Sequence, residues 1–396
     1  MANNNNTKNL NVPNLRFPEF KGEWEKCKLE ECVVFLDGKR KPIKSSERVS
    51  EQKLYPYYGA SGIIDYIDDY LFDGKFILLS EDGANILDRN YRVAFIAEGK
   101  IWVNNHAHVL QSNDNIDINF IAEKLESLDY SIYNTGTTMP KLNQEVCRNI
   151  PLWLPPTEEQ VKIGTLLSLL NERITTQSKI IEDLKLLKKI MSQNIFSLKI
   201  RFKDEEGNVF SSWKLRKLSD VLIIQGGYAF KSSLFNQGTN KVIRIGDILP
   251  IIKLSNFSGI YSSETPNEKY IVRKNDFVMA LSGATFGKVG KIEDKGIAYI
   301  NQRVATFRTK QCLEFFYQLV QINNFKNYIS SIPTASAQPN ISNDDIGNYK
   351  SYIPDVIEQT KIAGFLSTID KKIETERAIL DAYAKQKQYL LANLLI

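Results

Sequence analysis

Residues 155–174 read PPTEEQVKIGTLLSLLNERI, and residues 354–373 read PDVIEQTKIAGFLSTIDKKI. When Pro155 is placed on Pro354, the two segments share a proline, a Glu-Gln pair, a Lys-Ile pair, a Leu-Ser pair and an isoleucine. Near the start of each copy, Trp24 and Leu29 correspond to Trp213 and Leu218. The chain therefore contains an internal repeat, and two similar units on one chain predict a pseudo-symmetric molecule.

Each quoted segment is expected to open a long helix. A proline followed by Thr or an acidic residue suits a first helical turn. Beyond that turn, one residue in every three or four forms a heptad seam. The two seams carry polar residues at matching places, and their members are Leu170, Ile174, Gln177, Ile181, Leu184, Lys188, Met191 and Ile195, and Ile369, Ile373, Glu376, Leu380, Tyr383, Lys387, Leu390 and Leu394.

The polar seam positions indicate how the two helices pair, because a buried contact between like charges is costly. A parallel pair would place Lys188 on Lys387. In an antiparallel pair, Lys188 faces Glu376 and Gln177 faces Lys387, so the charges agree. We therefore predict an intramolecular antiparallel coiled coil. Dimerisation with another chain is the alternative use of such a helix, but it does not explain why the polar positions complement each other within this chain.

Short runs of β-branched and aromatic residues fill the regions before both helices. Examples are residues 76–79 and 93–96 in the first copy and residues 242–245 and 277–280 in the second, with Gly, Asn or Asp turns between runs. The predicted fold class is α+β, with two pseudo-twofold related mixed α/β domains joined by two long antiparallel coiled-coil helices. The expected divisions are a mobile N-terminal tail (1–20), a first domain (21–156), a central spacer helix (157–198), a second domain (199–354) and a distal spacer helix (355–396).

Composition narrows the classes of protein without choosing one. The 396 residues exceed what one hydrophobic core organises, and the net charge of +5 permits an anionic partner without requiring one. The four cysteines form no CxxC pair, and no apolar run approaches the roughly 20 residues that a membrane helix needs. A cytoplasmic protein with free thiols and no metal site is expected.

Motifs for catalysis are also missing. The turn from Gly283 to Lys288 is one residue short of a phosphate-binding loop and is followed by Val289 instead of Ser or Thr. The Pro155-Pro156 pair belongs to a helix start and not to a loop that holds a flipped base. The acidic residues at the start of the distal helix do not have the spacing to lysine that a nuclease needs. The chain is therefore not expected to be an enzyme.

The repeated order of motifs carries a resemblance. Each copy has Trp-x4-Leu, then Thr-x4-Pro-x-Leu/Ile (Thr135, Pro140 and Leu142; Thr334, Pro339 and Ile341), a strand ending in proline, Glu-Gln-x-Lys-Ile and a heptad helix. Over essentially the whole chain this order resembles the specificity subunit of type I restriction-modification systems. The second copy reads Ser-Ala-Gln-Pro from Ser336 to Pro339, whereas the first has Met139 in place of Gln338.

The resemblance implies a function in DNA recognition. Two target-recognition domains would each read one half of a split double-stranded DNA site, and the helices would set the spacing between the halves. Two methyltransferase (modification) subunits would supply adenine methylation, and restriction/translocase subunits would supply ATP-driven cleavage. No cofactor is expected on this chain, because S-adenosylmethionine, ATP and Mg would belong to the partner subunits. The alternative is a pseudo-symmetric coiled-coil scaffold that binds two copies of a protein partner and does not read DNA.

Candidate DNA-binding residues were chosen by their chemistry near predicted turns. Asn and Gln can bond adenine, Arg can bond guanine, and Lys can contact phosphates. Other interpretations stay open: the histidines as satisfied polar groups near a strand end, the lysines as solvated side chains, and the tyrosines as packing residues. The candidates are Tyr58, Ser61, Asn104, Asn105, His106, His108, Tyr228, Lys231, Ser282, Thr285, Lys288, Asn301, Gln302 and Arg303.

Overall fold

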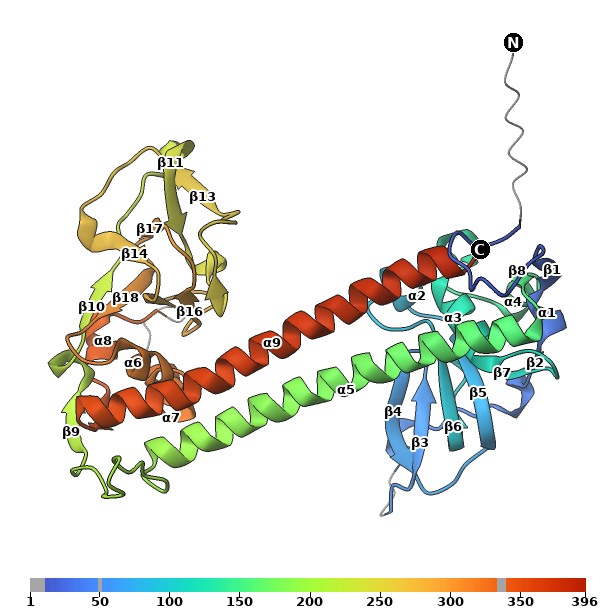
Figure 1. Ribbon diagram of the computed structural model, residues 1–396, viewed down its shortest axis with the longest axis horizontal. Coiled ribbons are helices and arrows are strands. Elements are labelled where there is room, and N and C mark those ends of the chain that lie inside the picture. The colour runs from blue at the N-terminus through green and yellow to red at the C-terminus, as the bar shows by residue number, and fades with distance from the viewer. Residues whose placement is uncertain (1–10, 49–51, 333–339) are drawn as a thin grey trace, which may run out of the picture. The chain divides into compact units, whose positions relative to one another are not determined.

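The computed structural model describes residues 11–48, 52–332 and 340–396, and it divides into two compact units (Figure 1). The first unit comprises Met1–Lys179 and Arg377–Ile396, and the second comprises Ile180–Glu376. Each unit contains mixed sheets with short helices, together with parts of the two long helices α5 (Thr157–Phe196) and α9 (Val356–Leu394). The predicted α+β class and the two long helices are confirmed.

A six-stranded sheet in the order β2-β7-β5-β6-β3-β4 forms the centre of the first unit. The first and last strands of the domain, β1 and β8, pair with each other in a separate ladder. The expected strand at 76–79 is part of β5, and residues 94–96 of the second expected strand are part of β6, which begins one residue after Val93. The elements are β1 (Glu25–Lys28), α1 (Leu29–Cys32), β2 (Val33–Phe35), η1 (Asp37–Lys39), η2 (Ser45–Glu47), β3 (Tyr55–Gly59), β4 (Gly62–Ile67), β5 (Phe72–Ser80), α2 (Asn85–Asp88), β6 (Ala94–Val103), β7 (Ala107–Ser112), α3 (Ile118–Ser127), η3 (Tyr130–Tyr133), α4 (Gln144–Arg148) and β8 (Pro151–Leu154).

Two glycines lie opposite each other at the centre of this sheet. Gly74 on β5 and Gly99 on β6 are paired, and both have positive φ, at 145° and 86°. Side chains other than glycine rarely adopt such angles, so this pair favours glycine. Beyond it, β6 pairs in parallel with β3 at Trp102 and Val103. The pairing of Ala107 on β7 with Ser80 on β5 places the loop after β6 beside the end of β5.

The second unit uses two sheets where the first uses one. Their orders are β10-β18-β15-β16-β12 and β13-β11-β17-β14, and β9 pairs with β19 as β1 pairs with β8. The elements are β9 (Lys214–Lys217), η4 (Leu218–Asp220), β10 (Ile223–Gly226), η5 (Ser232–Leu234), β11 (Phe235–Ile243), η6 (Ile245–Asp247), β12 (Ile251–Ile252), β13 (Ile260–Ser262), η7 (Glu268–Tyr270), β14 (Ile271–Arg273), β15 (Phe277–Ala280), β16 (Val289–Ile292), β17 (Ile297–Ile300), β18 (Val304–Arg308), α6 (Leu313–Leu319), α7 (Asn323–Ser331), α8 (Asn343–Gly347) and β19 (Lys350–Ile353).

The repeated Glu-Gln pair locks each domain to its own long helix. In the first unit, Glu159 is fully buried and receives two hydrogen bonds from Arg16, at 2.8 and 2.7 Å. The side chain of Gln160 donates to the carbonyl of Pro155 and accepts from the backbone N–H of Asp117. One motif therefore fixes both the helix start and the preceding strand, and its carboxylate needs a cation because a buried charge must be paired.

The second unit repeats this arrangement with different donors. Glu358 is also fully buried, and it accepts two hydrogen bonds of 3.0 Å from Arg201 and one of 2.8 Å from the indole of Trp213. Gln359 donates to the carbonyl of Pro354. The matching contacts explain in physical terms why the proline and the Glu-Gln pair occur in both copies of the repeat.

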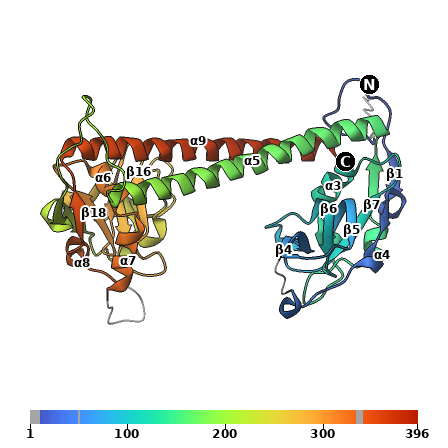
Figure 2. The same cartoon turned by 90° about the horizontal axis from the view of Figure 1, so that it is seen from below.

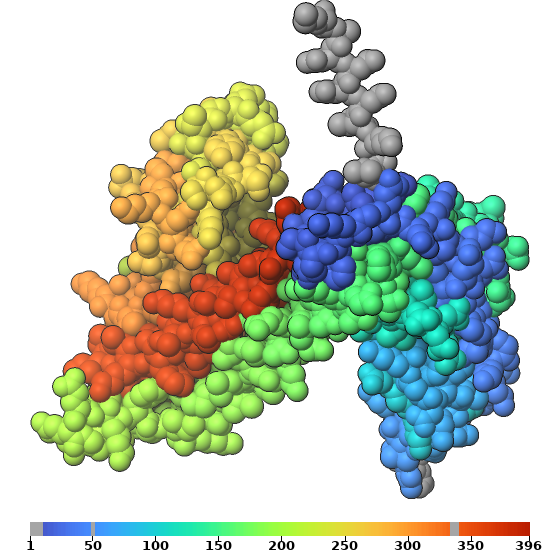
Figure 3. Space-filling model, turned by 45° about the vertical axis from the view of Figure 1, so that its right-hand side comes forward, coloured from blue at the N-terminus to red at the C-terminus, as the bar shows by residue number. Residues whose placement is uncertain are grey.

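Residues 11–20, which were expected to belong to a mobile tail, contact the rest of the first unit, and residues 1–10 lie outside the described part. Besides the Arg16 ion pair, the backbone N–H of Leu15 donates to the carbonyl of Asn393 near the end of α9. Figure 3 shows the N-terminal part of this unit in blue against the start of α5 and the end of α9. The Arg16 contact supplies the cation that the buried Glu159 requires.

All sixteen predicted seam residues are buried or half-buried. In the first unit, Lys387 on α9 forms an ion pair of 3.0 Å with Glu123 on α3, and Asn171 on α5 donates to the same carboxylate. Figure 2 shows α3 between the sheet and the long helices of this unit. The amide of Gln177 was expected to face Lys387. The carboxylate that pairs with Lys387 comes instead from α3, an element that the comparison of the two long helices did not include.

The matching contact in the second unit corrects the predicted partner of Lys188. Lys188 donates to both oxygens of Asp370, at 2.6 and 2.8 Å, and not to Glu376 as predicted. Gln318 on α6 donates to the same carboxylate at 2.9 Å, and Glu376 pairs with Lys372 on its own helix. The charges still favour an antiparallel pair of long helices. The carboxylate that binds Lys188 lies beside the seam, where Gln318 of α6 also contacts it.

Candidate nucleic-acid interface

In the first unit, four loops meet beyond the end of β5. We call residues 58–62, 80–84, 104–106 and 140–142 the first loop edge. The backbone N–H of Glu81 donates to the carbonyl of His106, and the backbone N–H of Leu142 donates to the carbonyl of Glu81. The backbone N–H of Asn104 donates to the carbonyl of Tyr58. Loops far apart in the sequence are therefore held together by main-chain bonds, and their side chains are free to differ.

The second unit repeats this set of backbone bonds at residues 226–228, 243, 281–288, 301–303 and 340–341, which we call the second loop edge. The N–H of Leu281 donates to the carbonyl of Arg303, and the N–H of Ile341 donates to the carbonyl of Leu281. The N–H of Asn301 donates to the carbonyl of Ile243. Each bond has a counterpart in the first loop edge, so the chain presents the same loop arrangement twice on different side chains.

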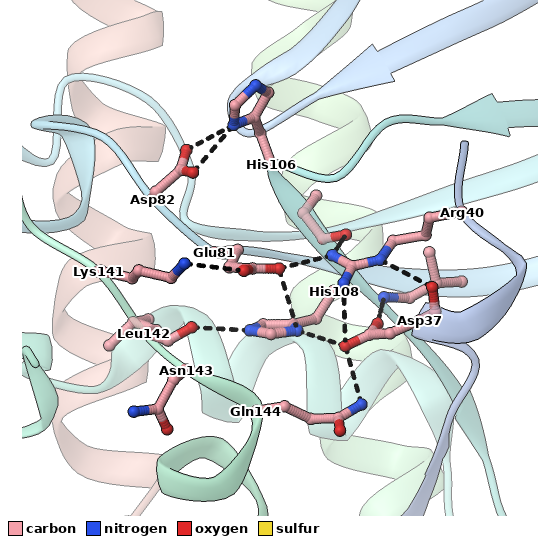
Figure 4. Close-up of polar contacts among 12 residues, drawn as sticks. Asp37, Arg40, Glu81, Asp82, His106, His108, Lys141, Leu142, Asn143 and Gln144 are labelled. Carbon is pink, nitrogen blue, oxygen red and sulfur yellow. Dashed lines mark hydrogen bonds and ion pairs between the residues drawn. The ribbon is translucent and has the colours of Figure 1, made fainter. Parts of the chain in front are cut away.

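A network of charged groups supports the first loop edge from below (Figure 4). Asp37 accepts hydrogen bonds from the ring of His108, the amide of Gln144 and the backbone N–H of Val109. Arg40 donates to Glu81 at 2.7 Å and to the carbonyl of Ala107 at 2.8 Å.

The ring of His108 is positively charged in this network. Its Nδ1 lies 2.6 Å from Asp37 Oδ2 and its Nε2 lies 2.8 Å from the carbonyl oxygen of Leu142. Both partners can only accept, so both ring nitrogens must donate. Burial of the ring is the largest single influence and opposes the charge, but the hydrogen bonds and electrostatic interactions with Asp37 and Cys147 together outweigh it and raise the pKa of His108 to about 10. For Asp37, burial likewise opposes ionisation, and the bond from His108 nevertheless lowers the pKa of that carboxyl.

The structure separates the candidate side chains of the first loop edge into exposed and enclosed ones. Asn105, His106 and Ser61 are exposed, and His106 Nδ1 lies 2.9 Å from each carboxylate oxygen of Asp82. Asn104 is 4% exposed and caps the loop by accepting from the backbone N–H of His106.

Two further candidates of this edge are enclosed to different degrees. His108 is 1% exposed and fully bonded, so it corresponds to the satisfied polar group of the alternative interpretation. Tyr58 is half-buried beside the ring of Phe95.

At the second loop edge, Gln302 and Arg303 are exposed, while Asn301, Ser282, Thr285 and Lys288 are half-buried. The guanidinium of Arg303 donates to the side-chain oxygen of Asn340 at 3.1 Å. This bond holds the Arg303 side chain in one orientation. The contact with Asp82 does the same for the ring of His106.

Tyr228 and Lys231 lie beside this edge near Glu264. The Tyr228 hydroxyl donates to that carboxylate at 3.3 Å, and the charge of Glu264 raises the pKa of Tyr228. The carboxylate also accepts from the backbone N–H of Lys231, whose side chain is exposed.

Several residues of the two edges were missed by sequence reasoning. Glu81, Asp82 and Lys141 in the first unit and Asn340 in the second lie within the loops, and Lys141 forms an ion pair with Glu81. Asp82 comes shortly after the predicted strand at 76–79 and precedes a glycine, a pattern that could have indicated a turn at the sheet edge. Thr334, Ser336, Gln338 and Pro339, which the motif comparison used, lie outside the described residues.

Within residues 11–48, 52–332 and 340–396, no group of three or more His, Cys, Asp and Glu side chains could hold a metal ion. In the same ranges, no helix combines the length and the apolar character needed to cross a membrane.

Comparisons with known proteins agree with this architecture. A family model described as the type I restriction modification DNA specificity domain matches residues 21–186 and 211–382. The type I restriction enzyme MjaVIII specificity subunit of Methanocaldococcus jannaschii is 28% identical in an alignment over 408 residues that covers 96% of this chain and 93% of that protein.

Two solved structures share the fold at low sequence identity. The S subunit of a type I restriction-modification system from M. genitalium superposes with a TM-score of 0.68 at 16% identity, covering 97% of this chain and 99% of that one. A chain from a structural study of complex assembly and conformational transition of the type I R-M system gives 0.51 at 14% identity, covering 93% and 96%. Because the family model matches both halves of the sequence, this chain belongs to the specificity subunits of type I restriction-modification systems, with two target-recognition domains.

Proposed function

We propose that this chain reads a bipartite double-stranded DNA target with its two loop edges and docks methyltransferase and restriction subunits. The observation that carries the proposal is the repeated loop arrangement. The same main-chain bonds join the loops in both units, whereas the exposed side chains differ, with Asn105 and His106 on one edge and Gln302 and Arg303 on the other. A shared scaffold with different polar groups suits two domains that read two different half-sites.

The side chains at each edge have the chemistry for reading bases. Asn and Gln amides can bond adenine in the major groove, and the Arg guanidinium can bond guanine. Contacts from Arg303 to Asn340 and from His106 to Asp82 hold these groups in one orientation, which lowers the entropy that binding must overcome. We place His108 and Asn104 in the support of the edge and not among the base-reading residues, because both are buried.

The proposed docking surface for the two methyltransferase subunits is the outer side of the long helices. On α5, exposed aliphatic residues lie on the side away from the buried seam in both units, among them Leu169 in the first and Leu186 and Ile190 in the second, which are 53%, 55% and 45% exposed. A helix with apolar residues on two faces has a second partner to bind. The M. genitalium relative and the type I R-M chain have the same fold, and a family member acts within a larger assembly, which supports this use.

We further propose the domain limits and the division of labour. Residues 21–156 and 199–354 form the target-recognition domains, and residues 157–198 and 355–396 form the spacer helices. The chain itself is a non-catalytic subunit. Adenine methylation and DNA cleavage, with S-adenosylmethionine, ATP and Mg, belong to the partner methyltransferase and restriction/translocase subunits.

The test is DNA binding by the chain assembled with its methyltransferase partner. Duplexes carrying random sequence are selected on the complex, and affinities for a selected and a scrambled duplex are then measured over a range of salt concentrations. Salt-sensitive binding with a preference for two short blocks at a fixed separation supports the proposal. A stable complex that binds both duplexes equally, or neither, favours the alternative of a protein scaffold that does not read DNA.

A further inference from the structure

A pocket beside the second loop edge holds two lysines without acidic partners. Its volume is about 470 Å³, and it is lined by residues of the β15–β16 turn and of α7. A single water occupies about 30 Å³ of liquid, so the pocket admits a much larger group. The turn contributes Ala284, Thr285, Phe286, Gly287 and Lys288, and α7 contributes Lys326, Ile329 and Ser330.

The turn is built to approach α7 closely. Gly287 has a φ of 71°, and a Cβ atom at that position would lie 2.7 Å from the side chain of Ile329. A side chain at that position would displace the end of the Ile329 side chain. Ile329 lies one turn of helix after Lys326, so both face the same side of α7. The turn and this side of α7 therefore contribute Lys288 and Lys326 to one pocket.

The polar groups of the pocket are donors that lack partners. Neither Lys288 nor Lys326 forms an ion pair within the described part of the chain, and no acidic residue lines the pocket. Thr285 Oγ1 is buried without a hydrogen-bond partner among the described residues. The ammonium groups of Lys288 and Lys326 repel each other across the pocket, so an anion bound between them would be stabilised by both.

The equivalent turn of the first unit has the opposite character. There Glu81 and Asp82 follow β5, and Glu81 pairs with Lys141 at 3.4 Å and with Arg40 at 2.7 Å. The first turn therefore balances its charges internally, whereas the second leaves two positive charges for a ligand. The difference lies in the side chains, because the backbone bonds of the two edges correspond.

We infer that this pocket binds a phosphate group, and that in the assembled complex the group is a backbone phosphate of the DNA held at the second loop edge. The inference rests on the proposed function for the source of the phosphate. Ser282 of the same turn bridges to Asn340, which bonds Arg303, so the pocket is continuous with the proposed base-reading side chains. A phosphate held here would anchor the register of the domain on DNA without adding sequence preference.

The experiment replaces each lysine by glutamine in the chain assembled with its methyltransferase partner. Affinity is measured by fluorescence anisotropy on a duplex with the target motif and on a scrambled duplex, between about 50 and about 200 mM salt. Loss of one phosphate contact lowers the slope of log affinity against log salt by about 0.9, which is a roughly threefold smaller loss of affinity over this range.

The DNA form of the proposal predicts a specific pattern. Lys288→Gln and Lys326→Gln weaken both duplexes by the same factor, and the double variant lowers the slope by about one contact and not two, because both lysines hold one phosphate. The control is Lys310→Gln, an exposed lysine just beyond the opposite end of β18 from the loop edge, and it leaves the slope unchanged. A change in motif preference for either pocket variant would contradict an anchoring role.

A second arm identifies the source of the phosphate by titrating inorganic phosphate into the complex without DNA. If the lysine variants lose phosphate binding but keep the salt slope, the pocket takes a free phosphate and the DNA assignment is overturned. If neither property changes, the phosphate site is wrong. Failure of the unaltered complex to distinguish the two duplexes would instead contradict the proposed function, and the phosphate titration would still test the pocket.

Discussion

Reversal of the charge at Lys188 tests how the two long helices are matched in the second unit. The ammonium group lies 2.6 and 2.8 Å from the oxygens of Asp370, and the two side chains are 17% and 31% exposed. Asp370 also accepts from Gln318 on α6, so three helices meet at this carboxylate. The substitution Lys188→Glu removes the attraction and brings two carboxylates together.

The magnitude follows from distance and exposure. Unit charges about 4 Å apart interact by roughly 4 kcal/mol at an effective dielectric constant near 20. Partial exposure and side-chain rearrangement reduce the measurable part, so the expected local destabilisation is about 2 kcal/mol. Because each 1.4 kcal/mol is a factor of ten, amide hydrogen exchange in this part of the helices should accelerate by roughly 30-fold.

The assay is hydrogen–deuterium exchange with mass spectrometry on peptides from residues 180–196 and 356–376. Lys188→Glu should accelerate exchange, and adding Asp370→Lys should restore much of the protection. The matched control is Lys189→Glu, an exposed neighbour on the same helix. Equal rescue by Glu376→Lys, or no acceleration by Lys188→Glu, would refute the pairing described above.

Three further predictions concern the domain junction, the charged support and the base-reading edge. Arg201→Met should lower the free energy of unfolding of the second unit by about 3 kcal/mol in chemical denaturation, because it leaves the buried Glu358 carboxylate without its cation. A decrease in this free energy of less than about 1 kcal/mol would contradict the prediction. The pKa of His108 is raised above its usual 6.5 to about 10, so the charged ring should stabilise the first unit fully below about pH 6.5, and this stabilisation should be lost as the pH rises toward about 10. The denaturation midpoints of the unaltered chain and of His108→Gln should therefore converge over this interval. A constant difference between the two midpoints would argue against a charged ring. Arg303→Ala should relax base preference in one half-site only, measured by sequencing of selected duplexes, and relaxation in both half-sites would contradict separate reading by the two edges.

The repeat, the fold class and the helix starts were predictable because each depends on local chemistry. Proline, Glu and Gln occur at the same places before both helices, and the structure gives each a matching contact, with Glu159 and Glu358 both fully buried. The strand expected at 277–280 is β15, and the two proline strands are β8 and β19. Periodicity and turn residues carry this information within short stretches of sequence.

The charge partners could not be predicted because they come from a third element. The seam comparison considered two helices, whereas α6 packs beside them and brings Gln318 to the Asp370 carboxylate that binds Lys188. In the first unit, α3 brings Glu123 to Lys387 in the same way. Tertiary neighbours of this kind leave no pattern in the helix sequence itself.

The sequence predicted which types of residue occur at the candidate site, but it did not predict which of these side chains are exposed. Both His106 and His108 were candidates by residue type, but only the structure shows that His108 is enclosed by Asp37 and Leu142 while His106 is exposed. Lys326 gave no signal in the sequence, since it lies on a separate helix and joins Lys288 only through the close approach of Gly287 to α7.

Genome-wide mapping of methyladenine tests the central proposal most directly. A host that expresses this chain together with its methyltransferase partner is compared with a host that expresses the partner alone. We predict a new split motif, in which two short specific blocks flank a fixed unspecified gap, and we predict that Arg303→Ala alters one block only. A stable complex that adds no new methylation would contradict the reading of DNA by these two domains.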